Sequence, residues 1–228
     1  MRLRLTILLC VLQSLSVGCS DKRLVNSIKS GDAQLSDKLL AEGVDVNARG
    51  TGGETSLHAA IMAGNKGIYT KLLLKGADPN ICNGQGASVV HLAAERNDVF
   101  WLHEALQHGG NPNQLNTGNR HSPNCTPLFY AIYKRLTPNV VELIAAGADV
   151  NHSNQHGMRP LSTALEMDLF DAMIKLVEAG ADPRLDRYFL SSDRFEGGFE
   201  NKIKDEGRKI SYQTLKALLI EKGYLKDD

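Results

Sequence analysis

The sequence predicts an all-α solenoid of helix pairs joined by short β-hairpin connections, and three observations support this fold class. A glycine-led phrase of five residues recurs along the chain, and a second phrase typical of a helix start recurs in register with it. Aromatic residues make up only 6% of the 228 residues, whereas Leu, Ala and Gly are plentiful. Because β-sandwiches depend on aromatic and β-branched residues, this composition favours close-packed short helices.

The glycine-led phrase marks the end of each predicted second helix. Its five copies are Gly43–Asn47, Gly76–Asn80, Gly109–Asn113, Gly147–Asn151 and Gly180–Arg184. The intervals between them are identical except for the third, which is longer. A glycine after a helix adopts a left-handed turn that other residues resist. A fixed period of this kind indicates a repeat architecture, in which each unit is one supersecondary element.

The second phrase marks the start of each predicted first helix, and its copies are Thr55–Ala60, Ser88–Ala94, Thr126–Ala131 and Arg159–Ala164. A Thr hydroxyl caps a helix, and Pro is well placed at its first position, where no N–H is needed. The second helices should bury an apolar stripe made of Leu39, Leu40, Leu72, Leu73, Val140, Val141, Leu143, Leu176 and Val177. No single repeat can bury its own apolar face, so stability comes from stacking.

These phrases resemble the ankyrin repeat, a β-turn followed by two antiparallel helices with a period of about 33 residues. The phrase at Thr55 resembles the Thr-Pro-Leu-His signature of that family, and the likeness covers residues 24–184 and, as a fading cap, 211–225. It implies a fold that binds proteins, and no catalytic role. It also implies that His58 and His91 bond to backbone across repeats. The matching later positions are Phe129 and Ser162, so no set of metal ligands is repeated.

Residues 1–18 are predicted to be an export signal, with two arginines, an apolar run from Leu5 to Leu15 and small residues before Cys19. The Gly18-Cys19 junction resembles a bacterial lipobox, which makes Cys19 the predicted lipidation site, although Ser16 stands where Leu is usual. Ordinary cleavage after a small-x-small triplet is the alternative. Residues 19–23 would form a short tether, and 24–225 the repeat domain. That domain has an extended hairpin at 113–125 and an insertion at 185–210.

The sequence shows no motif for catalysis, cofactor binding or metal binding. Lys+Arg and Asp+Glu both number 26, so net charge does not draw the chain to nucleic acid or to an anionic membrane surface. Cys82 and Cys125 lie on successive hairpins, and a disulfide between them is one interpretation in an oxidising envelope. Two free thiols are the favoured alternative, because hairpins stacked roughly 10 Å apart exceed the span of a disulfide.

A partner is expected at the hairpin tips and at the exposed positions of the first helices, which together line one face of such an array. The tips supply Arg49, Thr51, Gln85, Gln155 and His156. The helices supply Met62, Glu95, Arg96, Tyr133, Lys134, Glu166 and Met167. The third hairpin carries five extra residues, and insertions in repeat proteins map to loops that frequently bind. Asn116, Arg120 and His121 are therefore the strongest single cluster predicted.

Four functions fit an exported ankyrin protein that is a monomer when unbound. The chain resembles the ankyrin lipoproteins that neutralise periplasm-acting toxins of type VI secretion, notably phospholipase effectors, and an immunity role at the outer membrane is ranked first. A stabilising partner for a periplasmic enzyme such as catalase is second. A general envelope scaffold and an enzyme with an unrecognised site complete the set.

Overall fold

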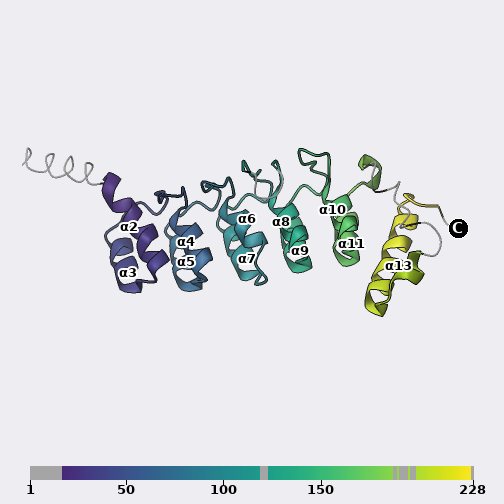
Figure 1. The fold of residues 1–228 in the computed structure, drawn as a ribbon, viewed down its shortest axis with the longest axis horizontal. Helices are drawn as coiled ribbons and strands as arrows, with labels where there is room; N and C mark the ends of the chain where they lie inside the picture. The colour runs from purple at the N-terminus through teal and green to yellow at the C-terminus, as the bar shows by residue number, and fades with distance from the viewer. Residues whose placement is uncertain (1–16, 119–122, 187–188, 190–194, 196–198, 227–228) are drawn as a thin grey trace, which may run out of the picture.

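The computed structural model describes residues 17–118, 123–186, 189, 195 and 199–226. Figure 1 shows a row of helix pairs with looped connections gathered along one edge. The first helices of the pairs are α2 (Val17–Ser30), α4 (Ser56–Ala63), α6 (Val89–Ala94), α8 (Pro127–Tyr133) and α10 (Pro160–Glu166). The second helices are α3 (Ala33–Ala41), α5 (Lys66–Leu74), α7 (Phe100–Gln107), α9 (Thr137–Ala145) and α11 (Phe170–Glu178). The 3-10 helices η1 (Pro183–Leu185) and η3 (Phe199–Lys202) follow, and α13 (Glu206–Glu221) closes the row.

The core is one continuous apolar layer running between the helix pairs. All but one of the side chains predicted for the apolar stripe of the second helices are buried. Val141 is the exception, at 41% exposed, because it lies on the side of α9 that faces away from the neighbouring helices. Ala59, Ala60, Ala93 and Ala94 are buried in the first helices, where small side chains let neighbouring repeats approach closely.

The connections differ from the predicted β-hairpins, because the described residues form no strand. Each connection is a turn closed by isolated backbone bonds, such as the Asn83 N–H to the Ala87 carbonyl at 2.9 Å. Its arms are only a few residues long, so the pairing does not extend into a ladder. We call these turns the fingers: residues 48–55, 81–88, 114–118 with 123–126, and 152–159.

An asparagine in each of the first four glycine-led phrases ties one repeat to the next. The Asn80 side chain donates to the Gly109 carbonyl at 2.9 Å and accepts from the Asn111 N–H at 2.7 Å. Asn113 makes the same two bonds to the following repeat, at 3.0 and 2.6 Å, and Asn47 and Asn151 repeat the pattern. The fifth phrase has Arg184 at this position, and that side chain turns back to Asp182 at 2.8 Å. The recurrence of the phrase therefore reflects a ladder of inter-repeat bonds.

Replacing Asn80 with Ala is expected to lower the free energy of unfolding by about 1–2 kcal/mol. The change removes both bonds and leaves a carbonyl and an N–H of the next repeat without their partner. Urea denaturation measures the effect. Asn97→Ala is the matched control, because Asn97 is exposed and makes no side-chain hydrogen bond within the described part of the chain. Equal losses in the two variants would contradict a role for the ladder in stability.

The N-terminal end departs from the sequence-based prediction, and the C-terminal insertion packs onto the closing helix. Helix α2 already begins at Val17, so residues 19–23, expected to be a tether, are helical. At the other end, Phe189 and Phe195 of the predicted insertion are buried. Their rings lie 5.1 Å apart, and Phe195 stacks on Tyr212 of α13 at 6.2 Å. These described positions of the insertion therefore form part of the apolar cap over the last repeat.

Candidate functional site: a groove between the fingers and the first helices

Two adjacent hollows, of about 510 and 380 Å³, lie between the first two fingers and the first helices. They share Met62, Asn83 and Gln85, and together we call them the groove. One hollow is completed by Lys29, Thr51, Gly52, Glu54, Ala59 and Ala63. The other is completed by Leu92, Glu95, Arg96 and Lys134.

Met62 forms the apolar centre of the groove. Its side chain is 67% exposed although α4 is otherwise buried along most of its length. The exposed thioether stands between the two hollows, beside Ala59 and Ala63 on one side and Leu92 on the other. Met is a flexible, polarisable side chain that is enriched at protein interfaces. Such a side chain presents apolar area that a partner can cover.

The N-terminal end of the groove holds a well-formed ion pair. The Lys29 ammonium donates to Glu54 Oε1 at 2.8 Å, and the Glu54 side chain is only 12% exposed. The hydrogen bond from Lys29 holds the pKa of Glu54 below its usual value. Both charges at this end are therefore neutralised within the chain.

The opposite end is cationic. The Arg96 guanidinium donates to the Ile61 carbonyl at 2.6 Å, which fixes its position without neutralising its charge. Lys134 is exposed, and no carboxylate within the described residues pairs with it. Glu95 lies beside them. Among the described side chains that line this end, two are cations and one is a carboxylate.

The fingers are held rigidly against each other at the rim. The Gly84 N–H donates to the Gly52 carbonyl at 3.0 Å, and the Thr117 N–H to the Gly86 carbonyl at 3.0 Å. A Cβ on Gly84 would collide with the Gly52 carbonyl, so only glycine permits this approach. Arg49 adds a bridge, because it donates to the carbonyls of Gly53 and Cys82 at 3.0 and 2.6 Å. The groove is thus largely preformed.

His58 and His91 have the structural role that the sequence predicts. In α4, the Thr55 N–H donates to His58 Nδ1 at 3.2 Å, which leaves the proton on Nε2 to reach the Ala87 carbonyl at 3.1 Å. His91 makes the same pair of contacts with Ser88 and with the Cys125 carbonyl at 3.2 Å. Each ring therefore caps its own helix and holds the finger of the next repeat.

Acidification is expected to destabilise the fold through His58. Burial lowers the pKa of His58 below 6.5, so the unfolded chain binds a proton more readily than the folded chain. The free energy of unfolding should then decrease as the pH falls below about 6.5 and be fully recovered above it. Denaturant unfolding between pH 8 and pH 5 measures the slope. His58→Gln should be less stable at pH 8 and show a shallower slope, and an unchanged slope would contradict this assignment.

Six of the residues predicted to bind a partner come together in the groove: Thr51, Met62, Gln85, Glu95, Arg96 and Lys134. Six others do not line it. Arg49 bridges two fingers, Gln155 and His156 contact each other on the fourth finger, and Tyr133, Glu166 and Met167 continue the row of first-helix positions. Arg120 and His121 lie outside the described residues.

Asn116 is a correction to the sequence-based prediction. It is 1% exposed, accepts the Cys125 N–H at 2.7 Å and donates to the Tyr130 hydroxyl at 3.1 Å. It closes the base of the extended finger and cannot meet a partner. The sequence-based prediction placed it on a binding loop because the third hairpin carries five extra residues, whereas here the amide oxygen accepts the buried Cys125 N–H.

The groove also contains residues that the sequence-based prediction missed. Lys29 lies one repeat period before Met62, so the same period extended by one repeat would have identified it. Glu54 and Asn83 had no such signal. Asn83 lines both hollows, and its side chain accepts the Gln85 N–H at 2.9 Å and so shapes the finger tip.

Cys82 and Cys125 are free thiols, so the disulfide interpretation is not supported. Cys125 is fully buried and Cys82 half-buried, and burial raises the pKa of the Cys82 thiol. Their sulfurs instead lie 4.0 and 3.9 Å from the amides of Gln114 and Asn154. Both cysteines therefore serve as packing residues.

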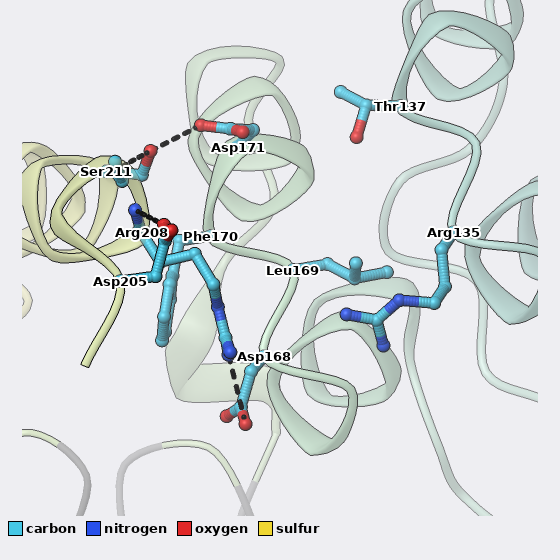
Figure 2. A pocket seen from close by; sticks show the side chains of 10 residues that line it. Arg135, Thr137, Asp168, Leu169, Phe170, Asp171, Asp205, Arg208 and Ser211 are labelled. Atoms are coloured by element: carbon cyan, nitrogen blue, oxygen red, sulfur yellow. Dashed lines mark hydrogen bonds and ion pairs between the residues drawn. The ribbon is translucent and has the colours of Figure 1, made fainter. Parts of the chain in front are cut away.

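A further hollow of about 370 Å³ lies where the α8–α9 and α10–α11 turns meet α13 (Figure 2). Arg208 pairs with Asp168 at 3.3 Å, and Ser211 donates to Asp171 at 2.7 Å, which ties α13 to the last repeat. Arg135 points into the same space and donates to the Met167 carbonyl at the end of α10 at 2.8 Å. The polar groups of this hollow thus serve to attach the closing helix and to cap α10.

Neither metal ligation nor a membrane span is visible in the part of the chain that the structure describes. No three His, Cys, Asp or Glu side chains come together there as metal ligands would. Among the same residues, no helix combines the length and apolar character that crossing a bilayer requires.

Comparison with known families agrees with this architecture. The family model for ankyrin repeats (3 copies) matches residues 24–116 and 90–187. The chain therefore belongs to the ankyrin-repeat family, whose members are typically protein-binding modules without enzymatic activity. No curated protein sequence matches the chain.

Proposed function

We propose that this chain binds a protein partner through the groove and that it does so in the bacterial cell envelope as an immunity protein against a secreted toxin. The observation that carries the binding site is the exposed Met62 in a preformed hollow, with charged side chains at both ends. Preformed apolar hollows with few, well-placed polar groups are the usual form of a binding site. The ankyrin fold supports the general role, and the sequence features of residues 1–19 support the location.

The immunity role rests on the resemblance to ankyrin lipoproteins that neutralise phospholipase effectors of type VI secretion. A neutralising partner must block the toxin before it reaches its substrate, and a lipid anchor at Cys19 would hold the module at the membrane, where such a lipase acts. A double acyl chain gives stable anchoring. A monomer is expected in the absence of the toxin.

The experiment is a pull-down of residues 20–228, tagged, from lysate of the source organism, with partners identified by mass spectrometry. Recovery of a lipase or another secreted toxin supports the immunity role. Recovery of a resident envelope enzyme such as catalase would make the chain a stabilising partner instead. Lys134→Glu and Met62→Asp versions run in parallel show whether capture depends on the groove.

Replacing Cys19 with Ser is expected to move the protein from the membrane fraction to the soluble fraction of the envelope. The reason is that the thiol is the proposed attachment point of the diacylglycerol, and without it only the folded module remains. Fractionation followed by immunoblotting measures the change, with Cys82→Ser as the matched control. Membrane retention of the Cys19→Ser protein would contradict lipidation.

A further inference from the structure

The distribution of charge and apolar surface within the groove specifies what it can hold. This inference rests on the proposed binding function and concerns only the chemistry of the partner. The apolar centre is Met62 with Ala59 and Ala63, and the charge at its N-terminal end is already cancelled by the Lys29–Glu54 pair. A charged group of a partner would gain nothing at that end and would lose its hydration.

The end of the groove lined by Arg96 and Lys134 carries charge that is not cancelled by an ion pair among the described residues. Arg96 is anchored by its bond to the Ile61 carbonyl, and Lys134 has no ion-pair partner among the described residues. Among the described residues, Glu95 is the carboxylate that lines this hollow. A partner carboxylate placed here meets two cations, one already fixed in position and the other available, whereas a partner cation meets a like-charge surface.

The apolar and cationic features of the groove lie close together. Met62, Arg96 and Lys134 line the same hollow of about 380 Å³. The Arg96 guanidinium donates to the carbonyl of Ile61, the residue before Met62, so its charge lies beside the apolar centre. An extended chain advances about 3.3 Å per residue, so an acidic side chain that meets both cations falls within about three residues of the apolar one.

We propose that the groove receives an extended segment of a partner protein that carries a large apolar side chain over Met62 and an Asp or Glu within about three residues of it, facing Arg96 and Lys134. The rigid fingers hold one side of this channel, so the segment binds without rearrangement of the repeats. Acidic residues elsewhere in the segment add little, because the other end of the groove is neutralised internally.

A random peptide library displayed on phage and panned on residues 20–228 tests this chemistry without knowing the partner. Selected peptides should share an aliphatic or aromatic residue and an Asp or Glu at the stated spacing. One selected sequence, synthesised with a fluorophore, should bind about tenfold or more weakly to the Lys134→Glu protein. Panning on that variant should enrich Lys or Arg in place of the acid.

The outcomes distinguish the charge preference of the groove from its role as the receptor for an extended segment. The charge assignment would be overturned if the selected peptides depend on Met62 but show no preference for Asp or Glu. It would also be overturned if they bind the Lys134→Glu protein with unchanged affinity. Either result would leave the binding role of the groove intact. Enrichment that is the same on Met62→Asp, or no enrichment at all, would overturn the groove as the receptor for an extended segment. Protein capture in the pull-down experiment would still report separately on the binding function. Thermal unfolding is the control that checks that both variants fold, which we expect because both substituted positions are exposed.

Discussion

Replacing Leu73 with Ala is expected to lower the free energy of unfolding by about 2–5 kcal/mol. Leu73 is 3% exposed on α5, which packs against α4 and α7, so the truncation leaves a cavity inside the second repeat. Domains of this size are stable by only about 5–15 kcal/mol, so this is a large fraction of the total. In a stacked array the loss also weakens the coupling to both neighbours, because each repeat contacts only those beside it.

Urea denaturation followed by circular dichroism measures the change, and the neighbouring residue provides the control. Leu74 lies on the same helix and is 72% exposed, so Leu74→Ala should alter stability by no more than about 0.5 kcal/mol. Comparable effects at the two positions would show that the helix is rotated relative to this description and that the repeat register is wrong.

Replacing Met62 with Asp is expected to weaken partner binding by about 30-fold or more, which corresponds to about 2 kcal/mol. The new carboxylate would replace the apolar area that Met62 offers to a partner, and it would compete with the partner's acidic group for Arg96, which lies beside it. Because Met62 is exposed in the free protein, stability should change little.

Leu74→Asp is the matched control for binding, since it places the same charge at an equally exposed apolar position on a second helix. Surface plasmon resonance with the partner recovered from the lysate measures both variants. Similar affinities for Met62→Asp and the unchanged protein would move the binding surface away from the groove.

The repeat architecture could be predicted from the sequence because its signals are local and recur. Glycines such as Gly76 and Gly109, with φ of 83° and 87°, end the second helices where the spacing of the phrases places them. Thr55 and Ser88 cap first helices, and the two histidines hold the next finger as expected. Each of these features depends on a short run of neighbouring residues. Once that run is recognised in one repeat, it can be found in the others.

The groove could be predicted only in part, because its composition depends on which side chains meet across repeats. The period correctly grouped Met62, Glu95, Arg96 and Lys134, which occupy equivalent or adjacent positions in successive units. It did not reveal that Asn116 turns inward, since that burial depends on Tyr130 of the following helix. Nor did it show that Glu54 is held by Lys29, which belongs to the preceding repeat.

Photo-crosslinking tests the central claim, that the groove is the binding surface, most directly. A benzophenone amino acid is introduced in place of Met62 in one protein and of Leu74 in another, and each is irradiated with the partner. We expect a covalent complex from position 62 and none from position 74. Crosslinking from position 74 alone would contradict the assignment and place the partner on the second helices.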